Sequence, residues 1–200
     1  MRFKRRIKNL GLTSWNFIRS QKFKNYKSGQ SELKLHLGCG QDYKEGWVNI
    51  DRSLLVKTDI NSDFLNIKRY FDYGSVDVVS MMHSISYLSL WEARIFFGDV
   101  FQLLKEGGVL EMEFPDISKC GRILSGTQNI DEYIEAVRGV FAFDLNQTIN
   151  KEKYKPYAFG WSAWHIENEL TKAGFTCVRI LDPLTHGQRS WRDTRVEAVK

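Results

Sequence analysis

The sequence predicts an α/β fold with a mostly parallel sheet and an antiparallel terminal strand. Short apolar runs of strand length alternate with stretches of helical periodicity, which is the order of a parallel sheet joined by helices. Two strand-like runs, residues 175–181 and 193–200, then follow each other at the end of the chain and form a closing pair. A length of 200 residues suits one domain and is enough to bury a sizeable apolar core.

The first expected strand, residues 33–37, is apolar and runs directly into a Gly-Cys-Gly turn. The second, residues 47–50, is equally short and ends at an aspartate. A weaker third strand is expected at residues 57–60. Residues 76–80 are apolar enough for a central strand that is covered on both faces.

A helix is expected to begin at Ser89 and to end at Gly107 and Gly108, since glycine commonly terminates helices. Residues 109–114 then alternate like a strand, which Pro115 stops. The apolar positions of the helix fall on one face at offsets typical of a 3.6-residue period, namely Ala93, Phe96, Phe97, Val100 and Leu104.

Residues 130–143 are expected to be helical, and residues 146–157 form a polar, turn-like segment that suits a mobile flap. A last helix over residues 163–172 has Ser162 as its expected N-cap and ends at Gly174. No internal repeat interrupts this order.

Charge divides the chain into a basic segment, residues 1–31, and a domain, residues 32–200. The segment holds nine of the 29 Lys and Arg residues and no acid, so the domain is mildly acidic although the whole chain carries +5. This division argues against a nucleic acid bound on the domain. Three interpretations of the segment stay open: an extra helix on the domain, peripheral membrane contact through residues 1–27, or an acidic or nucleic-acid partner.

The remaining composition indicates a cytoplasmic protein, with contact at the inner face of the membrane as an extension of that expectation. No apolar stretch approaches the roughly 20 residues that span a bilayer, and the basic start runs into no signal-peptide core. Three widely spaced cysteines give neither a disulfide framework nor a metal-ligand pair, so no metal is expected.

A ligand site is predicted where the first two strands end. A strand that ends in Gly-x-Gly (Gly38 to Gly40) turns tightly and leaves no side chain in a ligand's way, while Asp51 can accept both ribose hydroxyls of an adenosine. A dinucleotide is disfavoured because Tyr43 stands where its third glycine would be. The short interval to Asp51, interrupted by Gly46, also leaves too little room for the usual long helix under a pyrophosphate.

Several ordered motifs resemble those of class I S-adenosylmethionine (SAM)-dependent methyltransferases, within the subgroup that has a short first crossover and is often found near glycosyltransferases. The resemblance covers about residues 33–200. Its motifs are Leu37-Gly-Cys-Gly40, Gly46-Trp-Val-Asn-Ile-Asp51, Val76-Asp-Val-Val79, Leu103-Leu-Lys-Glu-Gly-Gly108, Phe114-Pro-Asp116, Phe159-Gly-Trp-Ser162, Ala173-Gly-Phe175 and Arg192-Asp-Thr-Arg-Val-Glu197.

The resemblance implies a Rossmann-like fold, SAM as cofactor, and a set of binding residues. The methionine part would lie against the turn, the ribose against Asp51, and the adenine beside Arg52 and Asp59. Met82 and His83 would cover the sulfonium. The implied cofactor residues are Leu37, Gly38, Cys39, Gly40, Asp51, Arg52, Asp59, Met82 and His83.

His83 is the expected general base, because an imidazole can accept a proton near neutral pH; Asp116 and Tyr87 are weaker candidates. The sequence departs from the family at this point. Relatives commonly have His-x-x-Glu-His-Leu, whereas this chain has Ser86 in place of the Glu and Tyr87 in place of the second His.

These features predict an enzyme that transfers a methyl group from SAM to a hydroxyl of a sugar or other small metabolite. Aromatic residues of the segment 154–164 are candidates for the acceptor side. The alternative is a SAM-binding accessory module at a surface-polysaccharide or membrane-associated complex, which the altered motif and the basic segment favour. A nicotinamide oxidoreductase is disfavoured by Tyr43, and a nucleic-acid methyltransferase by the absence of an aromatic–Pro–Pro signature.

Overall fold

A computed structural model describes residues 32–142, 156–184 and 191–200. The basic segment 1–31 and most of the expected flap lie outside the described residues. Within them, no helix is both long and apolar enough to cross a membrane.

The described chain forms a seven-stranded sheet in the order β3-β2-β1-β4-β5-β7-β6. Strands β1 to β5 pair in parallel, and β7 is antiparallel to both of its neighbours. This confirms the predicted mostly parallel sheet with an antiparallel terminal strand. The strands are β1 (Lys34–Leu37), β2 (Val48–Asp51), β3 (Ile60–Asn61), β4 (Val76–Met82), β5 (Leu104–Pro115), β6 (Thr176–Leu181) and β7 (Asp193–Val199).

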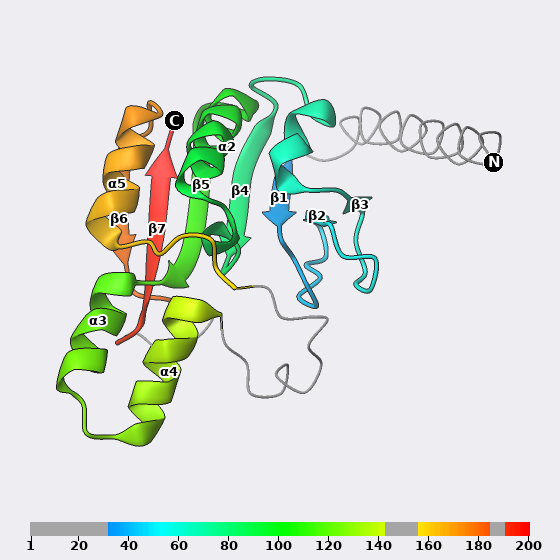
Figure 1. The fold of residues 1–200 in the computed structure, drawn as a ribbon. Helices are drawn as coiled ribbons and strands as arrows, with labels where there is room; N and C mark the ends of the chain where they lie inside the picture. Colours follow the sequence, from blue (N-terminus) through cyan, green and yellow to red (C-terminus); the bar gives the residue numbers. More distant parts are fainter. Residues whose placement is uncertain (1–31, 143–155, 185–190) are drawn as a thin grey trace, which may run out of the picture.

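Helices α2 and α5 lie in front of the sheet in Figure 1, where α2 packs against β5 and α5 against β6 and β7. Helices α3 and α4 pack on each other beyond the carboxyl end of β5 (Figure 1). The helices are η1 (Phe64–Arg69), η2 (Ile85–Tyr87), α2 (Leu90–Leu103), α3 (Ile117–Gly126), α4 (Ile130–Phe141) and α5 (Ala163–Lys172).

Helix α2 begins at a capping box and buries the apolar face that its sequence predicts. Ser89 begins it with a complete capping box, in which the Ser89 hydroxyl accepts from the Glu92 amide and the Glu92 carboxylate accepts from the Ser89 amide. The predicted apolar face is fully buried, and each large side chain there contributes roughly 1.5–3 kcal/mol of burial free energy. The sheet face and this helix therefore make one continuous core.

The predicted end of α2 is wrong. The helix ends at Leu103 and the chain becomes extended at Leu104, so Gly107 and Gly108 lie inside β5. Gly107 has a φ of +75°, a conformation that glycine tolerates, and a Cβ on Gly108 would lie 2.9 Å from the Lys105 carbonyl oxygen. The two glycines permit a positive φ and a close backbone approach near the start of β5. A pair of glycines at a helix terminus has the same sequence pattern, so the sequence does not distinguish the two.

Smaller differences are also local. The third strand is Ile60–Asn61 rather than residues 57–60, and Phe175 is buried just before β6. Ser162 stands at the N-cap of α5, but its hydroxyl makes no capping bond. The predicted short crossover from β1 to β2 is confirmed, because residues 38–47 contain only turns, a bend and irregular chain.

Candidate functional site

A cavity of about 330 Å³ opens at the carboxyl ends of β1 and β2. Its volume falls in the range of small-molecule sites, and its position is where open α/β sheets bind ligands. It is lined by Gly38, Gly40, Asp51, Arg52, Asp63, Phe64, Leu65, Ser84, Tyr87, Leu88 and Glu92.

The glycine turn lies against the cavity with its backbone exposed. Gly38 and Gly40 have φ values of +64° and +53°. A Cβ on Gly38 would come within 2.2 Å of the Ser84 hydroxyl oxygen, which itself donates to the Gly38 carbonyl. A side chain at Gly38 is therefore excluded by both conformation and space, and a ligand can approach the peptide backbone there.

Asp51 is fixed by the turn that it faces. Its Oδ2 accepts from the Gly40 amide at 3.0 Å, and its Oδ1 accepts from the Ser53 amide at 2.7 Å. A carboxylate has about four acceptor positions, so each oxygen can accept one further hydrogen bond. This geometry suits a cis-diol such as a ribose.

Asp59, predicted to lie beside an adenine, has a structural role. One carboxylate oxygen accepts from the Tyr43 hydroxyl at 2.8 Å, and the other accepts from the backbone and side-chain amides of Asn49. It does not line the cavity, whereas Asp63 does. The parallel pairing of β2 with β3 brings Asp59 next to Asn49, and a position of Asp59 beside the adenine stays a prediction.

Other predicted cofactor residues form the support of the cavity rather than its lining. Leu37 is fully buried, and Cys39 is buried with its thiol directed at the carbonyl oxygens of Gly40 and Lys57. Burial, followed by the charge of Asp51, raises the pKa of Cys39 to about 11, so this thiol is not reactive. Met82, at the end of β4, is also absent from the lining.

The apolar wall of the cavity was not predicted. Phe64, Leu65 and Leu88 come from η1 and from the loop before α2, and only their tertiary placement marks them. Glu92 had a local signal, the Ser-x-x-Glu capping box, but that signal indicates a helix start rather than a site.

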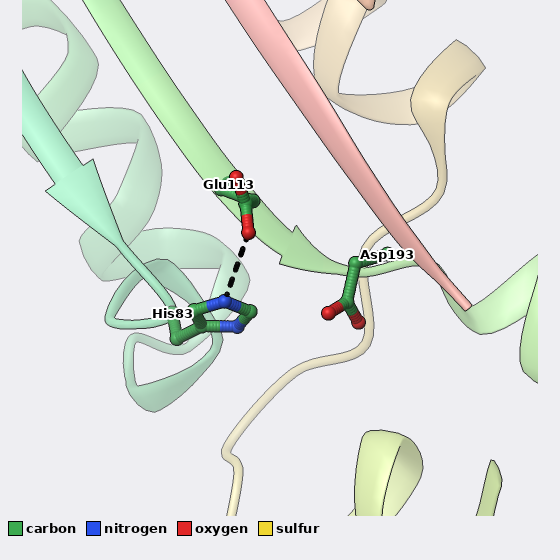
Figure 2. Close-up of side chains that lie close together, drawn as sticks. All are labelled: His83, Glu113 and Asp193. Atoms are coloured by element: carbon green, nitrogen blue, oxygen red, sulfur yellow. Dashed lines mark hydrogen bonds and ion pairs between the residues drawn. The ribbon is translucent and has the colours of Figure 1, made fainter. Parts of the chain in front are cut away.

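His83 lies just beyond the end of β4 and faces two buried acids. Figure 2 shows its imidazole near Glu113 of β5 and Asp193 of β7, and ligand-type atoms of the three residues all lie within 4.8 Å of one another. Nε2 of His83 is 3.2 Å from Oε1 of Glu113. The backbone of His83 has a φ of +54°, a strained conformation for a non-glycine residue.

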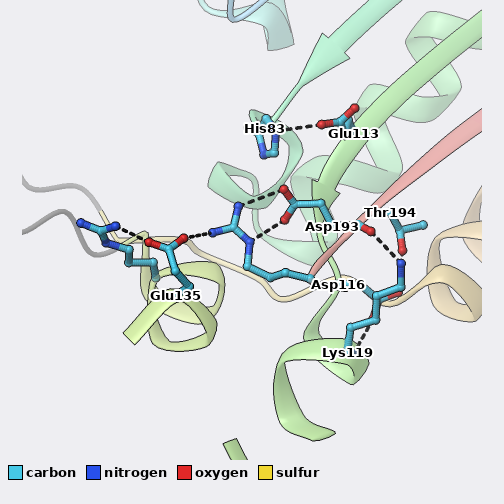
Figure 3. A network of polar contacts seen from close by, with 9 residues as sticks. His83, Glu113, Asp116, Lys119, Glu135, Asp193 and Thr194 are labelled. Carbon is cyan, nitrogen blue, oxygen red and sulfur yellow. Dashed lines mark hydrogen bonds and ion pairs between the residues drawn. The ribbon is translucent and has the colours of Figure 1, made fainter. Parts of the chain in front are cut away.

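The three residues have the donor types of a metal site, but their bonds favour a polar network (Figure 3). Arg192 binds both oxygens of Asp193, at 2.7 and 2.9 Å, and also reaches Glu135. Burial alone would lower the pKa of Arg192, yet Asp193 and Glu135 raise it, so the guanidinium stays charged. A metal ion would compete with this cation, and we assign none to the cluster.

Asp116, predicted as a weaker catalytic group, caps two helices. Its Oδ1 accepts from the amides of Ser118 and Lys119 in α3, and its Oδ2 accepts from the Ala163 amide of α5 and the Thr194 hydroxyl. All its acceptor positions are thus used, and the side chain is buried. These bonds indicate a structural role for Asp116, so His83 is the favoured candidate for the base.

The predicted aromatic cluster divides into core and surface. Trp161 is fully buried, Phe159 packs against the core, and Tyr157 meets Tyr87 edge to face. Burial, with Tyr87 nearby, holds the pKa of Tyr157 above its ordinary value. Trp164 alone of these residues is largely exposed, and Tyr154 lies outside the described residues.

Several of the solved structures that share this fold are methyltransferases. A SAM-dependent methyltransferase from Archaeoglobus fulgidus aligns with a TM-score of 0.58 at 13% identity, over 92% of this chain and 94% of that one. A possible histamine N-methyltransferase from Thermotoga maritima aligns with a TM-score of 0.53 at 15% identity, over 96% of each chain.

Phosphoethanolamine N-methyltransferase 2 of Haemonchus contortus, solved with S-adenosylhomocysteine, aligns with a TM-score of 0.52 at 14% identity, over 93% of this chain and 52% of that one. No family model and no curated protein matches the sequence. At these identities the likeness shows the fold, which is that of class I SAM-dependent methyltransferases.

Proposed function

We propose that this protein is a SAM-dependent methyltransferase that acts on a hydroxyl of a small acceptor, with a sugar as the favoured class. The observation that carries the proposal is the cavity in which the Gly38–Gly40 backbone and the Asp51 carboxylate face the same space. The fold shared with methyltransferase structures supports it.

In the proposed complex, each of the three parts of SAM lies against lining groups of suitable chemistry. The exposed backbone of the glycine turn suits the methionine part, and the free acceptor positions of Asp51 suit the ribose. Phe64 and Leu65 would form an apolar wall for the adenine, and Asp63, which also lines the cavity, is the proposed acceptor for its amino group. The crossover that follows β1 contains no helix whose amides would hold a pyrophosphate, which favours a cofactor without phosphates.

The bound cofactor supplies a methyl group on a good leaving group, a sulfonium that departs as a thioether. The protein then has to align the acceptor, exclude water and remove one proton. In the proposed step, the His83 imidazole takes up the hydroxyl proton as the oxygen attacks, and the Glu113 carboxylate beside it stabilises the imidazolium that forms. A positioned base of this kind contributes roughly 10²–10⁴-fold in rate.

Calorimetry with S-adenosylhomocysteine tests the cofactor assignment. Asp51→Ala should weaken binding by about 10- to 100-fold, since a hydrogen bond to a charged group contributes about 1.5–3 kcal/mol. Asp131→Ala, which removes an exposed acid from α4, serves as the matched control and should leave affinity unchanged.

Unchanged affinity in a folded Asp51→Ala protein would overturn the assignment. Release of S-adenosylhomocysteine with a panel of methyl glycosides and other small alcohols tests turnover. Cofactor binding without turnover on any acceptor would indicate the accessory module instead. A cytoplasmic location, peripheral membrane contact through residues 1–27 and a sugar acceptor stay proposals; the three free thiols support the first.

A further inference from the structure

A second cavity, of about 530 Å³, lies at the same edge of the sheet, between the N-termini of α3 and α5 and the carboxyl end of β6. It shares no residue with the first cavity. It is lined by Asp116, Ser118, Lys119, Arg122, Ser162, Ala163, Trp164, Ile180, Leu181, Asp182 and Thr194.

Trp164 gives this cavity an aromatic platform. Its side chain is 68% exposed although it stands on a well-packed helix. One side of the indole stacks on His165, with ring centroids 5.3 Å apart at 27°, and His165 in turn contacts the rings of Trp161 and Phe159. Packing against these aromatic side chains therefore holds the exposed Trp164 ring in position. Because the ring is already ordered, ligand binding costs little of its side-chain conformational entropy.

Polar groups around Trp164 are able to form hydrogen bonds with a ligand. The Ser162 hydroxyl lines the cavity in a residue that is only 4% exposed, and it bonds to no group among the described residues. Arg122 is exposed, and no acid in the described ranges pairs with its guanidinium. Asp182 adds an exposed carboxylate, so the cavity offers both donors and acceptors.

The helix N-termini do not make this an anion site. Three of the amides that a phosphate would use already donate to Asp116. The charges of Lys119 and Arg122 are also balanced by Asp116 and Asp182. An apolar ring face with mixed hydrogen-bonding groups on one side, and no net charge, matches the chemistry of a neutral saccharide.

We propose that this second cavity binds a pyranose ring, stacked on Trp164 and hydrogen-bonded by Ser162, Arg122 and Asp182. Its use as a subsite for the acceptor rests on the proposed function, and a saccharide acceptor then extends from the His83 region toward α3 and α5. Lys119 links the two regions, because its Nζ donates to the backbone oxygen of Asp193 at 2.7 Å.

The test is an NMR titration of the ¹⁵N-labelled full chain with methyl α-glucoside, methyl α-galactoside, methyl α-mannoside and, separately, inorganic phosphate. The indole N–H of Trp164 is assigned by its loss in Trp164→Phe. We expect at least one glycoside to shift this resonance and the amides of Ala163 and Arg122. Phosphate should leave them in place.

Trp164→Ala and Arg122→Ala should each weaken glycoside binding by about three- to tenfold, in line with the loss of one ring or one hydrogen-bonded contact. Trp91→Ala removes a comparably exposed tryptophan, 71% exposed on α2, and Arg69→Ala removes an exposed arginine of η1; neither should change the affinity.

The inference is overturned if no glycoside shifts the cavity resonances at the solubility limit, or if phosphate alone shifts them. It is also overturned if the Trp164 and Trp91 variants bind equally. Because glycoside binding is measured without cofactor, its failure is distinct from a failure of S-adenosylhomocysteine to bind the first cavity.

Discussion

Two residues just beyond the ends of neighbouring strands, Gly38 after β1 and His83 after β4, have backbone conformations that most side chains avoid. Gly38 tolerates its positive φ without strain, whereas His83 does not. The His83 amide donates to the Glu113 carbonyl at 2.7 Å, and its ring meets the Glu113 carboxylate, so two bonds to one residue stabilise the strained position. Strain retained at a strand end beside buried acids is typical of a functional position.

Replacement of His83 by Gln should lower turnover by about 10²–10⁴-fold and leave S-adenosylhomocysteine affinity within about twofold, because the base acts on the acceptor rather than on the cofactor. The measurement is steady-state kinetics beside calorimetry. If the His83→Gln protein keeps full kcat, His83 is not the base.

Glu113→Gln serves as the companion variant, since it keeps shape and burial but cannot stabilise an imidazolium as a carboxylate does. We expect a smaller loss in kcat than for His83→Gln and an altered pH profile of kcat. An unaltered pH profile would contradict the pairing of Glu113 with the base.

At the scale of elements, one carboxylate joins three parts of the fold. Asp116 follows β5, caps α3, holds the first amide of α5 and accepts from β7. These bonds connect residues up to 78 positions apart in the chain. The arrangement fixes α3 and α5 around the second cavity, which is why that cavity has a defined shape.

Asp116→Ala should destabilise the protein by about 2–4 kcal/mol, because it leaves three helix amides and the buried Thr194 hydroxyl without their acceptor. Asn129→Ala is the matched control: Asn129 caps α4 alone and at an exposed position, so about 1 kcal/mol is expected. Chemical denaturation measures both variants. Equal losses would show that the second helix gains nothing from Asp116.

Glu169 links α5 to α2 and predicts an acid-sensitive contact. Hydrogen bonds from Arg94, and then from Lys172, lower the pKa of Glu169 from 4.5 to about 2 against the opposing effect of burial. A lowered folded-state pKa stabilises the protein above the unfolded value, and this contribution is lost as the pH falls from about 4.5 toward 2. Solvent around Arg94 and Lys172 screens the pair, so we expect about 1–2 kcal/mol.

The free energy of unfolding measured from pH 7 to pH 2 checks this expectation. Wild type should lose more stability over the acid range than Glu169→Gln, which removes the titrating group. If the two curves of unfolding free energy against pH are parallel, protonation of Glu169 does not change the stability of the protein.

For the whole molecule, a cofactor that binds only the folded state should raise its stability. S-Adenosylhomocysteine at about 100 times its Kd adds about 2.7 kcal/mol, which corresponds to a rise of several degrees in Tm for a chain of this size. Differential scanning fluorimetry measures the shift, with NADH as the comparison ligand. A rise with NADH and none with S-adenosylhomocysteine would indicate a nicotinamide protein.

Local sequence patterns were enough to predict the fold class, the glycine turn and the buried face of α2, and to single out Asp51 as a candidate. Each depends on neighbours within a few residues: the alternation of strands and helices, a Gly-x-Gly after an apolar run, or apolar positions one turn apart. Such local patterns favour a backbone conformation directly, so they can be recognised in the sequence without knowledge of the tertiary contacts.

The hydrogen-bond partners of the polar side chains, in contrast, depend on tertiary contacts. The family resemblance placed Asp59 beside an adenine, and Asp116 follows a strand, yet their oxygens accept bonds from Asn49 and from Ala163 and Thr194. Glu113 looked like an alternating strand residue, yet it pairs with His83, 30 positions away. A carboxylate can bind a ligand or act as a base only through acceptor positions that other protein groups do not use. Strand register and helix packing determine which protein groups lie within hydrogen-bonding distance.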